Sequence, residues 1–220
     1  MALSLRPGLT FCEIQHHLIF MDYDADRYFS LSGPARDILQ KLLTCSGASY
    51  TEQEIAPLRA AGIIGHGEGA KPLKPCQHAA AGRSILDEDD GPSCMAAQVP
   101  AIIVRLAAMR RTLKRQGLPT TLRRIREATP LCVGVGSSAT GMRRLCAAYE
   151  ASRRYYLPVD HCLIRALTLY RHAQQRGHDA RLVFGVHLHP FSAHCWVEQD
   201  DLILDDRVDH VRRFTPILVL

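Results

Sequence analysis

Hydrophobic and polar positions alternate in the first part of the chain. The apolar run 18–21 is flanked by polar residues, the Asp-rich segment 22–26 can turn the chain, and the run 27–31 is again mostly apolar. Alternation bounded by turn residues is typical of strands. The pattern therefore predicts strands joined by turns within residues 10–31.

A helical period follows these strands. Ser32 can cap a helix that opens at Gly33, and the apolar residues after it are spaced for one helix face. A second helix is predicted to open with Thr51 and Glu54, which have capping-box spacing, and to end at Gly62. Strands followed by helices predict a small N-terminal domain with a sheet and a helical part.

The composition changes between residues 66 and 92. This stretch is rich in Gly, Pro, Ala and polar residues and finishes in an acidic run, so it can bury little apolar surface. We therefore interpret residues 66–92 as a linker. It would join an N-terminal domain at residues 1–65 to a C-terminal domain at residues 93–220.

In the C-terminal part, helices are expected before strands. The helical period predicts helices at residues 99–116, 122–127, 142–154 and 162–175. Short runs rich in β-branched and aromatic residues predict strands at residues 182–186, 193–198 and 202–204. A helix followed by an antiparallel meander is typical of an α+β fold.

The composition is that of a globular protein. Of 220 residues, 47% are hydrophobic and 22% are charged, which excludes a wholly disordered or fibrous chain. The formal net charge of +5 is too small to indicate nucleic-acid binding by itself. Residues 105–126 contain eight basic side chains and no acidic one, a pattern typical of the solvated face of core-packing helices or of a surface for an acidic partner.

Eight cysteines and eleven histidines raise the question of disulfides, metal binding or thiol chemistry. The N-terminus lacks a secretory pattern, and no apolar run is long enough to span a membrane. We therefore expect a cytoplasmic protein with free thiols and no membrane insertion.

One cysteine lies where a helix would activate its thiol. Cys162 is at the predicted start of the strongest helix, where free backbone N–H groups favour a thiolate. In the strand at 193–198, the period of two puts His194 on one face with Trp196 and Glu198, whereas Cys195 faces the other side and is expected to belong to the core. A histidine beside an aromatic side chain suits a general base or acid.

A carboxylate after the next strand could complete a catalytic triad. A three-residue loop at 199–201 would place His194 opposite Asp206. A two-residue loop at 200–201 would shift the register by one residue and bring Asp205 to the face of His194. The spacing of the residues leaves both registers open.

Several runs in the C-terminal part resemble one enzyme family. The runs DHCLIRAL at 160–167, RGHDARLVFGV at 176–186 and PFSAHCWVE at 190–198, with FTPI at 214–217, closely resemble the leader peptidases of lasso-peptide biosynthesis. The resemblance extends from about residue 142 to the C-terminus. It implies a transglutaminase-like, papain-like cysteine peptidase domain whose triad is Cys162, His194 and Asp206, and it favours the three-residue loop.

The N-terminal part is similar to a second family. Residues 28–31, the helix after Gly33 and residues 61–64 resemble the small leader-recognition domain related to the pyrroloquinoline-quinone chaperone family. The resemblance implies a winged-helix-like domain with a three-stranded sheet, in which a leader peptide adds as an extended strand beside the third strand and packs on the last helix. The candidate contacts are Arg27, Tyr28, Phe29 and Leu58.

The two resemblances together imply hydrolysis of the bond between leader and core in a ribosomally made precursor peptide. Cys162 would attack the carbonyl carbon, His194 would transfer the protons, and Asp206 would orient the imidazole. The partners implied are the precursor peptide and an ATP-dependent macrolactam cyclase that resembles asparagine synthetase and takes the released core.

No cofactor is expected for this chain itself. The glycine-rich segment 134–141 lacks the lysine of a phosphate-binding loop, so ATP is assigned to the cyclase. The pairs His187 with His189 and Cys76 with His78 lack a second pair of ligands, so no metal is expected.

Three other functions fit parts of the sequence. Acyl transfer to an amine would use the same triad and differ only in its product. A non-catalytic scaffold that delivers the precursor to the cyclase would have no need of a spaced triad. Nucleic-acid binding would use the winged-helix-like part and the basic stretch 105–126, but the first 65 residues are not notably basic.

Overall fold

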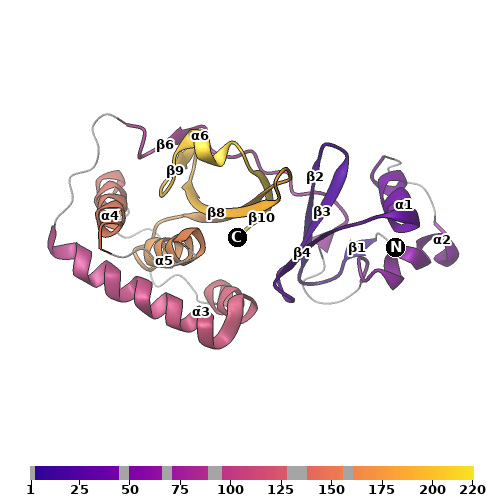
Figure 1. Ribbon diagram of the computed structural model, residues 1–220, viewed down its shortest axis with the longest axis horizontal. Helices are drawn as coiled ribbons and strands as arrows, with labels where there is room; N and C mark the ends of the chain where they lie inside the picture. Colours follow the sequence, from indigo (N-terminus) through magenta and orange to yellow (C-terminus); the bar gives the residue numbers. More distant parts are fainter. Residues whose placement is uncertain (1–2, 45–49, 66–70, 89–95, 128–137, 156–160) are drawn as a thin grey trace. The chain divides into compact units, whose positions relative to one another are not determined.

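The computed structural model describes residues 3–44, 50–65, 71–88, 96–127, 138–155 and 161–220 (Figure 1). The chain divides into two compact units, Met1–Gln77 and His78–Leu220. Each unit has its own sheet and its own helices, and each is considered separately below.

The described residues of the first unit contain a three-stranded antiparallel sheet. Its order is β2-β3-β4, and the strands are Leu9–Ile14, His17–Asp22 and Arg27–Ser30. Gln15 and His16 join the first two strands with positive φ angles of 48° and 64°, as in a tight two-residue hairpin turn. The strands predicted within residues 10–31 are confirmed.

Two helices pack on this sheet through apolar side chains. They are α1, Gly33–Thr44, and α2, Glu52–Ala60. The predicted capping box is confirmed, because Thr51 accepts from the Glu54 N–H while the Glu54 carboxylate accepts from the Thr51 N–H at 2.8 Å. The buried members of this core are Leu5, Leu9, Phe11, Leu18, Phe20, Leu39, Ile55, Leu58, Ile63 and Ile64.

The stretch 66–92, which we expected to be a linker, contributes to both units where it is described. Lys71–Pro72 forms β5 and pairs with β1, Ser4–Leu5, in the first unit. Arg83–Ser84 forms β6 at one edge of the sheet of the second unit. The stretch is held by this strand pairing and by hydrogen bonds from His78 and Ala81 to the buried carboxylate of Glu198, which a low apolar content does not exclude.

Three helices of the second unit lie on one side of its sheet (Figure 1). They are α3, Val99–Glu127, α4, Ala139–Ser152, and α5, His161–Gln175, and a short 3₁₀ turn at Ala96–Gln98 precedes α3. The stop predicted at Gly117 is a kink within α3, where Gly117 has a φ of 71° and separates two helical pieces. Helix α5 packs against the central strand β8.

The sheet of the second unit has the order β10-β7-β8-β9-β6 among the described residues. Its strands, besides β6, are β7, Arg181–His187, β8, Ser192–Gln199, β9, Leu202–Ile203, and β10, Thr215–Val219. The predicted meander is confirmed as the antiparallel pairing of β7, β8 and β9. A short helix, α6, Val208–Val211, lies between β9 and β10. The combination of helices with antiparallel strands agrees with the α+β fold expected from the sequence.

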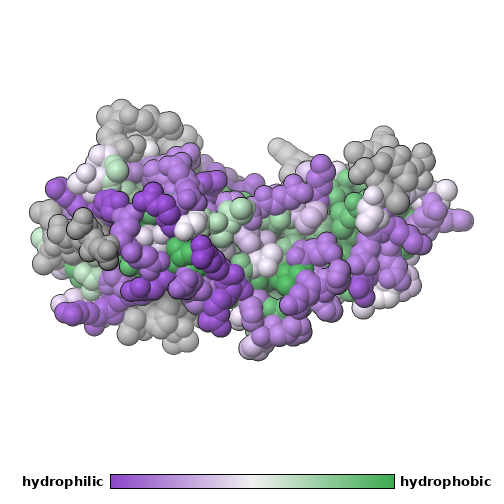
Figure 2. Space-filling model, turned by 90° about the horizontal axis from the view of Figure 1, so that it is seen from above, coloured by the Kyte–Doolittle hydropathy of each residue, from purple (hydrophilic) through white to green (hydrophobic). Residues whose placement is uncertain are grey.

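The basic stretch 105–126 belongs to α3. This helix buries Ile102, Leu106 and Met109, whereas most of its basic side chains are exposed. The exposure agrees with a solvated helix face. Among the described helices, none is long and apolar enough to cross a membrane. Hydrophilic residues cover much of the face shown in Figure 2.

Candidate active site

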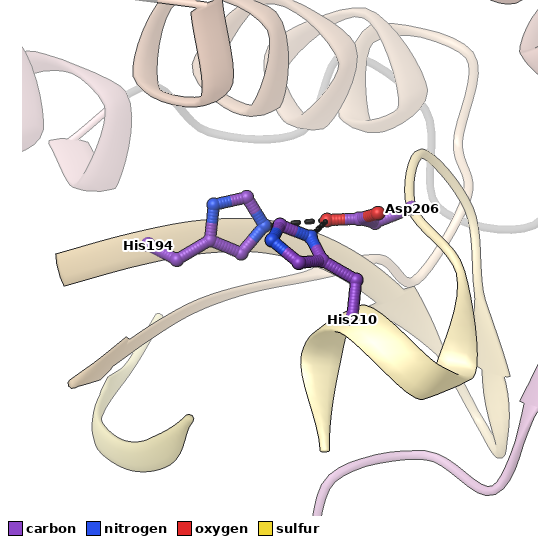
Figure 3. Close-up of side chains that lie close together, drawn as sticks. All are labelled: His194, Asp206 and His210. Atoms are coloured by element: carbon purple, nitrogen blue, oxygen red, sulfur yellow. Dashed lines mark hydrogen bonds and ion pairs between the residues drawn. The ribbon is translucent and has the colours of Figure 1, made fainter. Parts of the chain in front are cut away.

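Three polar side chains meet beside the end of β9. His194 comes from β8, Asp206 follows β9, and His210 comes from α6 (Figure 3). The Nε2 atom of His194 lies 2.5 Å from Oδ2 of Asp206, and the Nδ1 atom of His210 lies 2.7 Å from the same oxygen. The backbone N–H of Arg207 donates to the other oxygen, Oδ1, at 2.7 Å. The Asp206 carboxylate is thus held by three donors and orients the His194 ring.

The hairpin register differs from the one favoured by the sequence. Glu198 pairs with Ile203 and Gln199 with Leu202, so the loop has two residues and the expectation of a three-residue loop is wrong. In a continued hairpin this register would bring Asp205 to the face of His194. Instead β9 ends at Ile203 and the chain bends, which turns Asp206 toward the imidazole.

Asp205 has a different task. Its Oδ1 accepts from the Val197 N–H at 2.9 Å, a backbone group that has no strand partner because β9 has already ended. Asp205 is 8% exposed, and burial raises the pKa of its carboxyl to about 6, against the effect of the Val197 hydrogen bond. Asp205 therefore completes the backbone hydrogen bonding of β8, and Asp206 is the carboxylate of the site.

Cys162 lies in the first turn of α5 and is half-buried. The side chains of Cys195 and His194 are near enough to its thiol to shift its pKa. Because Nε2 of His194 is bound to Asp206, the other ring nitrogen, Nδ1, is the one left for the sulfur. The structure thus brings Cys162, His194 and Asp206 together in the order of a cysteine-enzyme triad.

The charges of this group favour an ion pair. Hydrogen bonding from Cys195, with the hydrogen bond and charge of His194, lowers the pKa of Cys162 to about 4 although burial acts against it. Burial alone would lower the pKa of His194, but its bonds to Asp206 and Cys162 raise it to about 9. Burial likewise opposes ionisation of Asp206, yet hydrogen bonds from His194 and His210 lower its pKa to about 2. These three shifts favour a thiolate at Cys162, an imidazolium at His194 and a carboxylate at Asp206.

His210 and Cys195 are members of this group that sequence reasoning missed. His210 packs edge-on against His194 with ring centroids 4.6 Å apart, and it is four residues after Asp206 on a helix of only four residues. The spacing of four was a usable signal, but α6 is too short to be predicted from periodicity. Cys195 was expected to be core and is 3% exposed, yet it also lowers the pKa of Cys162.

The Trp196 ring packs beside the His194 ring and is itself held by the carboxylate of Glu198. The Trp196 ring lies 6.0 Å from the His194 ring at 21°, as the shared strand face predicted. The Trp196 Nε1–H donates at 2.6 Å to Glu198, which is fully buried and also accepts from the Ala81 N–H. Gly185 lies opposite His194 on β7, and a Cβ there would meet the Trp196 ring at 2.8 Å. The site therefore depends on a glycine in the neighbouring strand.

Among the described residues, one group has the side-chain types that bind metal ions. In His194, Asp206 and His210, one possible ligand atom from each residue lies within 4.8 Å of the other two. Its nitrogen–oxygen distances of 2.5 and 2.7 Å are those of hydrogen bonds. Ligands of a tetrahedral zinc ion lie roughly 3.3 Å apart. The arrangement therefore serves hydrogen bonding.

Two of the other residues weighed as ligands, His78 and His187, have partners for their side chains. His78 is bound to Glu198 at 2.7 Å, and His187 lies 3.2 Å from the carbonyl oxygen of Pro190. The Cys76 N–H donates to the carbonyl of Phe11. The first part of the glycine-rich segment, 134–137, lies outside the described residues.

The candidate leader contacts lie in the first unit and differ in exposure. Arg27 is exposed on β4, Tyr28 and Phe29 are half-buried, and Phe29 also stacks on Phe20 with ring centroids 5.2 Å apart. Leu58 has 0% exposure and belongs to the core of the unit. Its side chain has no surface to offer a peptide, which corrects the expectation that it contacts the leader.

Comparison with known proteins identifies the second unit. The sequence model of the transglutaminase-like superfamily matches residues 101–219, more than half of the chain, and this range contains Cys162, His194 and Asp206. Searches of curated proteins and of solved structures gave no match. The family match agrees with the grouping of a cysteine, a histidine and an aspartate beside a helix start, and the chain belongs to the transglutaminase-like superfamily.

Proposed function

We propose that this protein is a cysteine peptidase that binds the leader of a ribosomally made lasso-peptide precursor and hydrolyses the bond between leader and core. The observation that carries the proposal is the hydrogen-bonded pair of His194 and Asp206, with Cys162 close enough for His194 to lower its pKa, within a transglutaminase-like domain. The restriction to lasso precursors rests on the resemblance of the runs at 160–167, 176–186 and 190–198.

The reaction follows from the ion pair. The Cys162 thiolate attacks the carbonyl carbon at the end of the leader, and the imidazolium of His194 gives its proton to the departing core amine as the C–N bond breaks. Water then attacks the thioester while His194 takes its proton, the C–S bond breaks, and the leader acid leaves with the thiolate and imidazolium restored. The backbone N–H of Cys162 at the helix start is available to bind the oxyanion.

The first unit is the proposed binding site for the leader. Strand β4 has a strand partner on one side only within the described sheet, so an extended peptide can add along its other side. Arg27, which is 64% exposed in its side chain and lies over the Phe29 ring at 5.4 Å, borders that edge. The released core would pass to an ATP-dependent macrolactam cyclase.

Cleavage is tested with the full chain and a synthetic precursor peptide encoded beside its gene. We expect mass spectrometry to show free leader and free core with wild type and with Cys146→Ala, a control that removes another buried thiol of the same unit. Cys162→Ala should bind the precursor and leave it intact. Cleavage by Cys162→Ala, or no cleavage by wild type, would reject the peptidase proposal.

Acyl transfer is a second candidate, because the superfamily match favours it as much as hydrolysis and both reactions share the thioester. Hydroxylamine added to the same assay distinguishes the two. Hydrolysis gives mainly the leader carboxylate, whereas a transferase gives mainly the leader hydroxamate at low amine concentration.

Leader binding is tested by fluorescence anisotropy with a labelled leader peptide. Arg27→Gln should weaken binding by about threefold or more, because it removes an exposed cation at the strand edge. Arg59→Gln removes an exposed arginine on α2 and serves as the matched control. Equal binding by both variants would show that Arg27 does not contribute to leader recognition.

A further inference from the structure

Asp206 lies just beyond the point where the sheet ends. Strand β9 stops at Ile203, and residues 204–206 form a bend. The Ser84 hydroxyl donates to the backbone carbonyl of Asp206 at 2.5 Å, which fixes the backbone but not the carboxylate. Rotation of an aspartate carboxylate about its Cβ–Cγ bond has broad minima. The donors around the two oxygens therefore decide where each oxygen lies.

Two donors besides His194 hold this carboxylate. The Arg207 N–H donates to Oδ1 at 2.7 Å, and Nδ1 of His210 donates to Oδ2 at 2.7 Å. Oδ2 is also the oxygen that accepts from His194 at 2.5 Å. Both imidazole rings approach Asp206 at this oxygen (Figure 3). His210 thus holds the one oxygen on which the orientation of His194 depends.

The ring of His210 is itself held in place, although 44% of its side chain is exposed. Its helix, α6, is anchored by Val211, which is fully buried. The His210 ring lies close to edge-on against two rings, with centroids 4.6 Å from His194 and 5.4 Å from Phe214. A ring fixed in this way can in turn fix the carboxylate that it binds.

The hydrogen bond does not depend on the charge of His210. Hydrogen bonds lower the pKa of Asp206 to about 2 against the effect of burial, and an ionised carboxylate can only accept. Nδ1 of His210 must therefore carry the proton of this bond. It can do so both in the neutral ring and in the imidazolium. The donor is thus present wherever Asp206 is ionised.

We infer that His210 is a positioning residue, which uses its Nδ1–H to hold Oδ2 of Asp206 in line with the Nε2–H of His194. The inference rests on the proposed role of His194 in proton transfer. Without this donor the carboxylate is free to rotate about its Cβ–Cγ bond, and the imidazole of His194 loses a fixed acceptor.

The test separates the hydrogen bond of His210 from the packing of its ring. His210→Asn keeps an N–H donor, because the amide nitrogen of asparagine is attached to Cγ as Nδ1 is, but it removes the ring. His210→Phe keeps a ring against His194 and Phe214 and removes the donor. His210→Leu also lacks the donor and repeats the comparison with a smaller side chain. Asp209→Asn changes an exposed neighbour on α6 and is the control.

The first readout is the pKa of His194, measured by NMR titration of the full chain with labelled histidines. The hydrogen bond to Asp206 is among the causes that raise this pKa to about 9. We expect the pKa to fall by about one pH unit in His210→Phe and His210→Leu, because the carboxylate is no longer held in line. In His210→Asn and Asp209→Asn it should change by less than about half a pH unit.

The second readout is steady-state cleavage of the precursor. His210→Phe and His210→Leu should lower kcat about tenfold or more, because the group that transfers protons is less well oriented. KM should stay within about twofold, since neither His210 nor Asp206 is proposed to bind the peptide. His210→Asn should keep kcat within about threefold of wild type.

Two results would overturn the inference. One is an unchanged or raised pKa of His194 in His210→Phe and His210→Leu, which would mean that His210 only competes for Oδ2. The other is a loss in His210→Asn as large as that in His210→Phe, which would assign the effect to the ring or to the fold. The NMR titration needs no peptide, so a wild type that fails to cleave the precursor would reject the proposed function and leave the result on His210 standing.

Discussion

Two adjacent aspartates carry opposite pKa shifts because they meet different surroundings. The carboxyl of Asp205 is buried against one backbone N–H, and its pKa is raised to about 6. That of Asp206 accepts from His194, His210 and the Arg207 N–H, and its pKa is lowered to about 2. The same side chain thus serves as a structural acceptor at one position and as the anion of the site at the next.

Exchange of each aspartate for asparagine separates these roles in catalysis. Asp206→Asn should lower kcat about a hundredfold or more, because the imidazolium of His194 loses its counter-charge and its orientation. Asp205→Asn should change kcat by less than about tenfold, since an amide oxygen still accepts from the Val197 N–H. Steady-state cleavage of the precursor measures both, and a larger loss in Asp205→Asn would reverse the assignment.

The raised pKa of Asp205 also predicts how stability depends on pH. The folded state holds the Asp205 proton more tightly than the unfolded chain does. The stabilising contribution of this proton to the free energy of unfolding is therefore present below about pH 4 and is lost as the pH rises through about 6. Above that pH, Asp205→Asn should be more stable than wild type by up to about 3 kcal/mol, and the difference should vanish at low pH.

Urea unfolding of both proteins across this range measures that difference. Other titrating groups, Cys162 and His194 among them, are common to the two proteins and cancel to first order in the comparison. A difference that does not change with pH would contradict the prediction.

The residues of the site could be predicted to different degrees. The helix start marks Cys162 and the strand period marks His194, because both signals are local. The choice of Asp206 came from family resemblance, and the register that it favoured is wrong because β9 is shorter than a regular hairpin requires. The effect of Cys195 on the pKa of Cys162 depends on how helix α5 packs against strand β8. No local sequence pattern encodes that packing.

At the level of elements, β7 shapes the site although it supplies none of the reacting groups. Gly185 lies opposite His194, and an added Cβ would come within 2.8 Å of Trp196 and 2.9 Å of Phe214. Both of these rings pack near the His194 imidazole. The missing side chain at Gly185 therefore lets two aromatic rings close over the histidine.

Gly185→Ala should destabilise the second unit by about 1–3 kcal/mol through overpacking. It should also slow cleavage, because a displaced Trp196 shifts His194. Gly82→Ala is the matched control, since its Cβ would make an ordinary contact of 3.5 Å with Asp201. The chain has one tryptophan, Trp196, so its fluorescence reports the unfolding of this unit directly. Equal stability of the two variants would argue against tight packing at Gly185.

Long elements were predictable and short ones were not. The period of α3 and α5 and the apolar runs of β7 and β8 are strong local signals. The strands β1, β5 and β6 have two residues each, and they exist because of partners distant in the sequence, whereas the equally short β9 lies in the predicted run 202–204 and pairs with its neighbour β8. A two-residue segment has no period, so such strands are visible only once the fold is known.

At the level of the whole molecule, the boundary between the units lies earlier than the composition suggested. The second unit begins at His78, and its first residues bind the buried Glu198 through the His78 ring and the Ala81 N–H. The Ser84 hydroxyl donates to the backbone carbonyl of Asp206 at 2.5 Å. A segment poor in apolar residues is thus part of the support of the site.

Two fragments test this boundary. A fragment of residues 78–220 should unfold cooperatively and alkylate at Cys162 as the full chain does. A fragment of residues 93–220 leaves the Glu198 carboxylate without two of its donors, which costs about 3 kcal/mol or more. We expect it to unfold at lower temperature or to lack a cooperative transition in calorimetry. Equal thermal stability of the two fragments would instead support a C-terminal domain that begins at residue 93, as the composition predicted.

The proximity of the Cys162 and Cys195 thiols also determines how this protein responds to an oxidant. Hydrogen peroxide converts the Cys162 thiolate to a sulfenic acid and releases hydroxide. This removes the thiolate charge that raises the pKa of Cys195, so the Cys195 thiol can lose its proton, attack that sulfur and displace its hydroxyl group as water to form a disulfide. We expect peroxide to inactivate wild type reversibly, with dithiothreitol restoring activity.

Cys195→Ala should instead proceed to the sulfinic acid and stay inactive after reduction. Peptide mapping without reductant would detect the Cys162–Cys195 linkage, and its absence after peroxide treatment would contradict this expectation. The Cys195 thiol would then protect Cys162 from irreversible damage.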